Sequence, residues 1–206
     1  LNDTKVEKFV ALFDIHFGFE KKYDVRSGRF KEKPTHDLRF LQQIMHFVSD
    51  FRPDTVILGG DQFNFDTLRN NRRGEKEAIT RDIGDIKRAY LIAKDNLFNP
   101  LNHYPWMKKV VIRGNHDQRL ERYLRNNPEW AGLIEPQDNL NLTTSDWEWL
   151  NYGDVYRMGK LNFIHGETLR CKAADSAKLA AARYLKNIRF GHFHTFAAAT
   201  LYSAID

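Results

Sequence analysis

The 206 residues carry 42% hydrophobic and 29% charged side chains, a composition typical of one globular domain and unlike that of a disordered chain. No apolar run approaches the roughly 18 residues that cross a bilayer, and the single Cys171 excludes an internal disulfide, so we expect a cytoplasmic protein. The formal net charge of +5 favours phosphate-bearing partners.

Strand-like apolar runs alternate with helical periodicity through the first half of the chain. The periodicity predicts strands at residues 8–13, 55–58 and 109–112, and helices at residues 38–51 and 79–97. Thr35 and Asp37 are capping candidates for the first helix, which Pro53 closes. The stretch 64–76 predicts a long exposed loop. Strands that run into polar motifs followed by helices are typical of an α/β domain with a largely parallel sheet.

The second half of the chain predicts further elements of both kinds. Residues 155–158 and 161–164 flank Gly159-Lys160 and predict a hairpin. Helices are predicted at residues 118–125 and 173–186, and a short strand at residues 188–190. In such a fold we expect reactive groups to collect at the carboxyl ends of the strands.

Five polar motifs stand where predicted strands end. In chain order they are Asp14-x-His16, Gly60-Asp61, Gly114-Asn115-His116-Asp117, His165 and Gly191-His192-x-His194. Oxygen ligands mixed with imidazole nitrogens suit divalent first-row metals, and the lack of a cysteine cluster argues against a structural zinc site. Two such ions about 3.5–4 Å apart supply the activated water and the counter-charge that phosphate-ester hydrolysis needs. The glycines would let the backbone turn sharply before each ligand.

Together these motifs resemble the signature of the calcineurin-like metallophosphoesterase superfamily, over residues 9–196. The resemblance implies an α/β fold, a metallophosphoesterase-type β-sandwich of mixed sheets flanked by helices, in one domain spanning residues 1–206. It also implies a metal-dependent phosphoesterase that uses a metal-activated water. Only 12 residues follow His194, too few to form the strands that normally complete the second sheet of this family. The chain could therefore be truncated at its C-terminal end.

The resemblance further implies a role for each site residue. One divalent ion would be held by Asp14, His16, Asp61 and His194, and the other by Asp61, Asn115, His165 and His192, so that Asp61 bridges the two. We expect Mn²⁺, with Fe, Zn, Ni, Co or Mg as alternatives. His116 would donate a proton to the leaving group and Asp117 would orient it; the alternatives are a turn histidine and a helix N-cap.

The residues around the ligands narrow the substrate class. Ser/Thr protein phosphatases of this superfamily carry Asp-Arg-Gly after the second motif, and the lipid A pathway pyrophosphatases carry Arg where His116 stands, so neither branch fits. Gly-Asn-His-Asp is shared by repair-type nucleases and general phosphodiesterases, which favours phosphodiesters of nucleic acids or nucleotides. DNA or RNA would be contacted by cationic residues that rim the cleft: Arg69, Arg72, Arg73, Lys76, Arg119, Arg122 and Arg125.

Several alternatives stay open from the sequence. The cationic residues could form a solvated face without a ligand. The chain could be a nucleic-acid-binding module whose metal site is structural or vestigial, or a general phosphomonoesterase. The remaining titratable and aromatic residues favour ordinary roles: His36, His46 and His103 in packing or on the surface, Asp66 in a loop, Asp82 and Asp85 on a solvated helix face, Trp147 and Trp149 in packing, and Glu167 beside a ligand.

Overall fold

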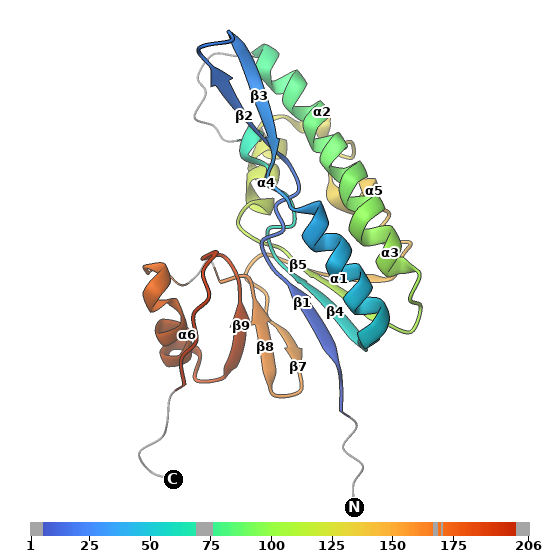
Figure 1. Ribbon diagram of the computed structural model, residues 1–206, viewed down its shortest axis with the longest axis vertical. Helices are drawn as coiled ribbons and strands as arrows, with labels where there is room; N and C mark the ends of the chain where they lie inside the picture. The colour runs from blue at the N-terminus through green and yellow to red at the C-terminus, as the bar shows by residue number, and fades with distance from the viewer. Residues whose placement is uncertain (1–5, 69–75, 167–168, 170, 201–206) are drawn as a thin grey trace, which may run out of the picture.

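A computed structural model of the chain describes residues 6–68, 76–166, 169 and 171–200 (Figure 1). Its first sheet has four parallel strands in the order β1 (Phe9–Leu12), β4 (Thr55–Gly59), β5 (Lys108–Ile112) and β6 (Trp147–Leu150). The second sheet has the order β7 (Tyr156–Met158), β8 (Leu161–Ile164) and β9 (Asn187–Phe190), with β7 antiparallel and β9 parallel to β8. The predicted parallel sheet and hairpin are thus confirmed.

The two sheets pack face to face through alternating apolar side chains. Ile57, Val110 and Ile112 of the first sheet form one buried cluster with Tyr156 and Phe163 of the second. The intervening side chains of the first sheet point to the opposite face and join a larger cluster with the helices. Because β4 is buried on both faces, its five residues form a continuous apolar run. The predicted sandwich of mixed sheets flanked by helices is confirmed.

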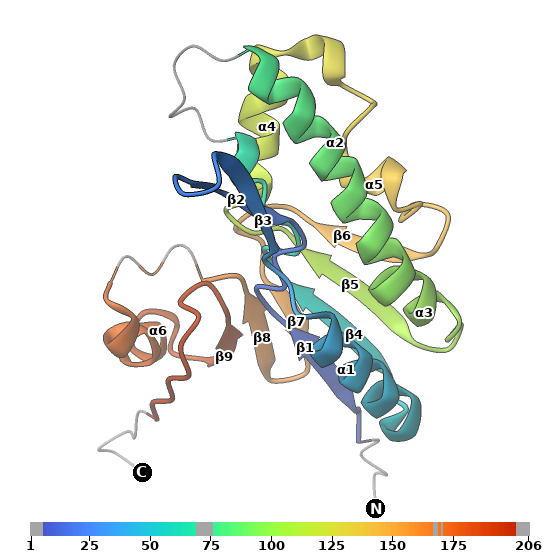
Figure 2. The same cartoon turned by 45° about the horizontal axis from the view of Figure 1, so that its top comes forward.

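The helices cover the face of the first sheet that lies away from the second sheet (Figure 2). The main helical elements are α1 (Leu38–Phe51), α2 (Lys76–Ala93), the π-helical turn η2 (Lys94–Phe98), α3 (Asn99–Asn102), α4 (Asp117–Asn126) and α5 (Pro136–Asn139). The helix α6 (Ser176–Tyr184) lies beside β9, and three short 3₁₀ turns complete the chain: η1 (Asp66–Leu68), η3 (Pro128–Trp130) and η4 (Ala173–Asp175). Within the described residues, no helix combines the length and apolarity that spanning a membrane requires.

The two capping candidates before α1 have different roles. Asp37 is the N-cap, because its Oδ1 accepts hydrogen bonds from Arg39 N at 2.9 Å and Phe40 N at 3.1 Å. Thr35 instead donates from its hydroxyl to His16 O at 2.6 Å. Thr35 therefore fixes the loop that carries the first motif, a function that the sequence pattern did not indicate.

A β-hairpin absent from the sequence prediction joins this loop to α1. It consists of β2 (Phe19–Asp24) and β3 (Arg29–Pro34), and it stands beside α2 (Figure 1). Lys21 pairs with Asp85 of α2, and Arg88 of α2 pairs with Glu32 at 2.5 Å. The solvated role predicted for Asp85 is therefore wrong, because its carboxylate holds the hairpin on the helix and is only 14% exposed.

The stretch predicted as a long exposed loop is partly buried. Asn64, Phe65 and Leu68 are 6%, 5% and 7% exposed, and η1 lies within this stretch. Residues 69–75 lie outside the described part of the chain, and so does the side chain of Lys76. The predicted exposure is therefore wrong for Asn64, Phe65 and Leu68, whereas Asp66 is exposed.

The second helix starts at Lys76, and its periodicity continues beyond Ala93 into η2 and α3. The helix type is therefore predicted correctly.

Candidate metal centre

The seven predicted ligands follow the carboxyl ends of five strands. Asp14 and His16 follow β1, Asp61 follows β4, Asn115 follows β5, His165 follows β8, and His192 and His194 follow β9. Parallel strands end at a common edge of a sheet, and the two sheets bring their edges together here. Three groups of described residues are close enough to hold a cation: Asp14 with His16 and His194; His16 with Asp61 and His116; and Asp61 with His165 and His192.

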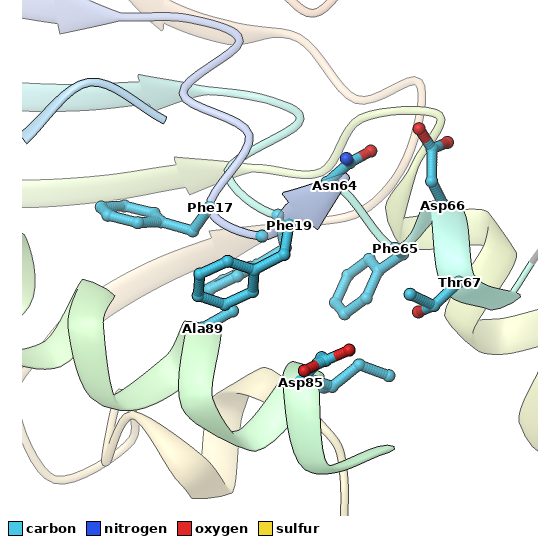
Figure 3. Close-up of a pocket in the computed structure, with 11 residues that line it drawn as sticks. Phe17, Phe19, Asn64, Phe65, Asp66, Thr67, Asp85 and Ala89 are labelled. Atoms are coloured by element: carbon cyan, nitrogen blue, oxygen red, sulfur yellow. The ribbon is translucent and has the colours of Figure 1, made fainter. Parts of the chain in front are cut away.

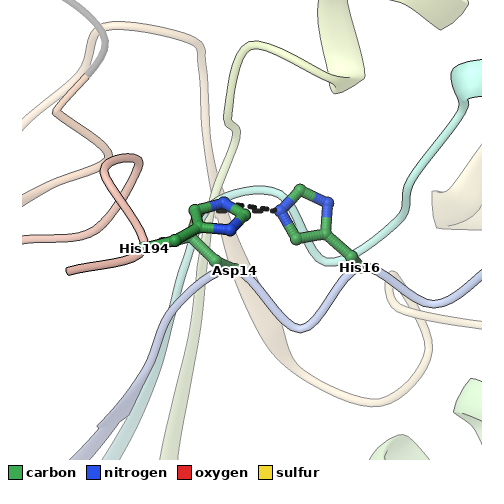
Figure 4. A group of neighbouring side chains, drawn as sticks. All are labelled: Asp14, His16 and His194. Atoms are coloured by element: carbon green, nitrogen blue, oxygen red, sulfur yellow. Dashed lines mark hydrogen bonds and ion pairs between the residues drawn. The ribbon is translucent and has the colours of Figure 1, made fainter. Parts of the chain in front are cut away.

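The first group converges on one point between two loops (Figure 4). The Nε2 atoms of His16 and His194 lie 3.1 Å apart, and they lie 3.9 Å and 3.7 Å from Oδ1 of Asp14. This Oδ1 is buried and accepts no hydrogen bond from any described residue. Ligand nitrogens of one first-row ion, each about 2.0–2.1 Å from the metal, lie about 3 Å from one another. The orphaned carboxylate oxygen and the facing nitrogens therefore fit a divalent cation.

The second group brings acceptor atoms together around Asn115. Oδ1 of Asn115 lies 3.0 Å from His165 Nε2 and 2.9 Å from His192 Nδ1. His165 donates from Nδ1 to Gly59 O at 3.1 Å, so in the neutral ring Nε2 carries a lone pair. That lone pair faces Asn115 Oδ1 and also Oδ2 of Asp61, at 3.2 Å. Three ligand-type atoms that converge in this way fit a shared cation.

The protonation states also suit metal ligands. Burial raises the pKa of Asp61, but the hydrogen bond and charge of His165, together with the charge of His116, outweigh it and lower this pKa to about 2. Burial, together with the neighbouring charge of His116, lowers the pKa of His16 to about 4. Burial likewise lowers the pKa of His192. At neutral pH Asp61 is therefore ionised, and His16 and His192 are neutral, which are the forms that bind metal.

The ligand loops hold an unusual backbone geometry. A positive φ occurs at Asp14 (54°), His16 (54°), Asp61 (52°), His192 (72°) and His194 (51°). Such a conformation at a non-glycine residue costs about 1–3 kcal/mol and persists only where surrounding contacts enforce it. Here Asp14 N donates to Gly60 O at 3.1 Å and His16 N donates to Asp61 O at 3.0 Å, which ties the first two loops together. Strain of this kind is typical of functional sites.

Two motif glycines are needed for space and not for a sharp turn. A Cβ at Gly114 would collide with the Asp61 carboxylate, and a Cβ at Gly191 would collide with that of Asp14. Among the motif glycines just before a ligand, only Gly60 has the left-handed φ, at +103°. The sharp-turn role predicted for all of them is therefore correct for Gly60 alone, because the others let one loop approach a ligand carboxylate of another.

His116 lies beside the ligands with its two ring nitrogens in different surroundings. Nε2 is 3.6 Å from Oδ2 of Asp61, and the ring stacks edge-on against His16 at 4.6 Å between centroids. Nδ1 contacts the carbonyl oxygen of Asn64, and the backbone N of His116 donates to Oδ1 of Asp61 at 2.9 Å. Burial lowers the pKa of His116 despite the nearby Asp61 charge. The turn thus fixes the imidazole against the bridging carboxylate.

Asp117 serves the turn that carries Asn115 and His116. Its Oδ2 accepts from Gly114 N at 2.7 Å, and burial raises the pKa of its carboxyl to about 7. The N-cap alternative is wrong, because α4 begins at Asp117 itself and the carboxylate bonds to an amide before the helix. The group that faces the imidazole Nδ1 is the Asn64 carbonyl, a backbone atom for which the sequence contains no signal.

The predictions for His36, His46, His103 and Trp147 agree with the structure, whereas Asp66 lies in the 3₁₀ turn η1 and not in a loop. His36 is buried against Phe17, whereas His46 and His103 are exposed. Trp147 is buried and donates from Nε1 to Asn102 Oδ1 at 2.9 Å. The side chain of Asp82 and the whole of Glu167 lie outside the described residues.

Comparison with known proteins adds one finding. A family model described as calcineurin-like phosphoesterase matches residues 8–196, which include all the ligand motifs. A search of the curated proteins found no match.

Proposed function

Because the chain belongs to the calcineurin-like phosphoesterase family, we propose that it cleaves phosphodiesters of nucleic acids or nucleotides. The family and the candidate ligand groups support metal-dependent hydrolysis of phosphate esters. The observation that carries the proposal is the pair of acceptor clusters on either side of Asp61, one with an orphaned Asp14 oxygen and one around Asn115.

Two divalent ions would be held by these clusters. Asp14, His16, Asp61 and His194 would hold one, and Asp61, Asn115, His165 and His192 the other, and we propose Mn²⁺ as the metal in activity assays. When bound, the ions supply an activated water and a counter-charge for the phosphoryl oxygens. The carboxylate of Asp61 stays ionised at neutral pH and joins both sets.

His116 is the proposed general acid. Its Nδ1 contacts the Asn64 carbonyl, and its Nε2 is the atom directed at the metal centre. A proton on Nε2 can then pass to the oxygen of the leaving group. Positioned proton transfer of this kind contributes about 10²–10⁴ in rate.

A polynucleotide substrate is supported by exposed cations on two elements near the site. Residues two apart on a strand share a face, so β3 presents Arg29, Lys31 and Lys33 on the side away from the ion pairs with α2. Arg122 and Arg125 are exposed on α4, the helix that starts directly after His116. Arg69, Arg72 and Arg73 belong to the undescribed stretch and stay a prediction, as does Lys76.

The test is a substrate panel with metal-reconstituted protein. It compares an aryl phosphodiester, an aryl phosphomonoester, single-stranded and duplex DNA, RNA and cyclic nucleotides, each at several salt concentrations. We expect turnover of diesters above monoesters and polynucleotide binding that weakens steeply with salt, because each neutralised phosphate releases counterions. A monoester preference would instead identify a general phosphomonoesterase. Polynucleotide binding without turnover at full metal content would identify a binding module with a structural metal site.

A further inference from the structure

We infer that Arg119 is a positioning residue for His116 and does not contact the phosphate backbone of the substrate. The inference rests on the proposed function, because it needs His116 as the proton donor. It assigns Arg119 a different role from the neighbouring arginines of α4, with which it shares a three-residue spacing.

Three groups meet at the Nδ1 side of the imidazole. Nη1 of Arg119 donates to Asn64 O at 3.0 Å and lies 2.7 Å from His116 Nδ1, which itself contacts Asn64 O. A guanidinium has no acceptor and a carbonyl has no donor. The arginine is therefore placed to donate to the carbonyl and to the ring nitrogen, and it holds the imidazole and the Asn64 carbonyl together.

The guanidinium of Arg119 also forms an ion pair through the same nitrogen atom. Nη1 also pairs with Oδ1 of Asp66 in η1, and the side chain is only 14% exposed. Arg122 and Arg125, by contrast, are exposed, and Arg122 contacts Gln118 Oε1 at 3.3 Å. A half-buried guanidinium that already binds a carboxylate and a carbonyl is poorly placed to bind a phosphate backbone, whereas the two exposed arginines are accessible to it.

The backbone around the Asn64 carbonyl is also fixed by a hydrogen bond and by packing. Asn64 is 6% exposed and its backbone N donates to Phe17 O at 2.9 Å. The next residue, Phe65, has a left-handed φ of 47°, and its ring packs near Phe63 and Tyr90 at centroid distances of 5.6 Å and 6.3 Å. Figure 3 shows the Phe65 ring directed toward α2, whereas the side chains of Asn64 and Asp66 point the other way. An aromatic residue in this conformation is strained, as expected where a segment serves a site.

The experiment measures how strongly each variant depends on the leaving group. Arg119→Met removes the donor to Asn64 O, Arg119→Lys keeps one charge and one donor, and Asp66→Asn removes the ion pair but keeps the guanidinium. Arg157→Met, on the exposed side of β7, is the matched control. For each protein, kcat and KM are measured on diesters that range from nitrophenolate to alkoxide leaving groups, together with metal content and thermal unfolding.

We expect Arg119→Met to lower kcat about 10- to 100-fold on alkoxide diesters, with little change on nitrophenolate diesters, in KM or in metal content. Arg119→Lys should restore part of this loss, and Asp66→Asn should show a smaller loss of the same kind even if Arg119→Met does not fold. A merely structural role would slow all substrates by the same factor.

Two results overturn the inference. One is an equal loss on good and poor leaving groups, and the other is a rise in KM or a weaker salt dependence of DNA binding in Arg119→Met. Failure of the proposed function is distinguishable, because His116→Ala would then lack the selective defect as well. If His116→Ala shows the defect and the Arg119 and Asp66 variants do not, only the positioning role is wrong.

Discussion

The metal centre and the surroundings of His116 adjoin each other but are built on opposite principles. At the metal centre, oxygen atoms of Asp14, Asp61 and Asn115 converge with imidazole nitrogens, and one carboxylate oxygen lacks any described hydrogen bond. Around His116, each donor meets an acceptor: the imidazole and Arg119 share the Asn64 carbonyl. The first region is complete only with cations, whereas the second is complete by itself.

This difference separates two kinds of variant. A change at the metal centre should alter metal content and therefore the rate on every substrate. A change beside His116 should leave the metal in place and alter the rate according to the leaving group.

The largest effect is expected for Asp61→Asn. In the proposed assignment Asp61 is a ligand of both ions, so one weakened ligand affects both. Metal content and kcat should therefore fall together, by more than the roughly 10- to 100-fold typical of residues that only support a ligand. Metal analysis and assays on good and poor leaving groups test this, with Asp175→Asn, an exposed carboxylate in η4, as the control. Full metal occupancy with wild-type turnover in Asp61→Asn would remove Asp61 from the site.

The next effect is the selective defect of His116→Ala. An alkoxide leaves poorly unless it is protonated, whereas a nitrophenolate leaves unaided, so the variant should lose about 10²–10⁴ in rate on natural diesters and far less on aryl diesters. Metal content should stay near wild type, because Asn115 and not His116 presents its oxygen to the histidine ligands. Loss of metal in this variant would place His116 in the metal centre and erase the contrast between the two regions.

Metal binding should also raise the thermal stability of the protein. A ligand at 100 times its Kd stabilises the folded state by about 2.7 kcal/mol, which raises the Tm of a domain of this size by about 5–10 °C. Without metal, Asp61→Asn should lower the Tm, because the pKa of about 2 means that His165 and His116 stabilise the ionised carboxylate in the folded state. This contribution is present above the unfolded pKa of 3.8, and the neutral amide cannot make it. Thermal unfolding with Mn²⁺ and with a chelator tests both statements. A metal-free variant that is as stable as the metal-free wild type would contradict this stabilisation of the carboxylate.

A smaller effect is expected for Gly114→Ala. The added Cβ would collide with the Asp61 carboxylate, and overpacking of this kind costs about 1–3 kcal/mol in the free energy of unfolding. The control is Gly84→Ala in α2, where the added Cβ meets no atom within 4 Å and should stabilise the helix by about 0.5–1 kcal/mol. Denaturant unfolding measures the change in the free energy of unfolding for each variant. Equal stability of the two variants would show that the loop at Gly114 can move to accommodate the added Cβ.

The two regions also differ in how far the sequence predicts them. The ligands act through their own side chains at strand ends, so a pattern of strands and motifs was sufficient to place Asp14, Asp61 and Asn115 together. The group that holds His116 is a backbone carbonyl, and any residue type at position 64 would supply one. Lys21 reaches Asp85, and Asp66 reaches Arg119, through contacts between distant segments, which helical spacing does not encode. The β2–β3 hairpin is not predicted from the sequence, because its largely charged strands contain no apolar run.

The smallest effect is expected for Asp117→Asn, and it shows how sharply the two regions are divided. The Asp117 carboxylate accepts from Gly114 N and so closes the turn that presents both Asn115, a metal ligand, and His116, the acid. An asparagine keeps an oxygen that can accept the same bond, so the turn should persist and metal content should stay unchanged. The loss of charge should disturb the imidazole slightly, which predicts a rate loss of less than about 10-fold, again larger on alkoxide than on nitrophenolate diesters. The matched measurement is Asp117→Ala, which removes the acceptor and should lower metal content as well, because the turn that carries Asn115 then opens. If Asp117→Asn already loses metal, the turn couples the two regions, and the separation between metal binding and proton donation does not hold at this residue.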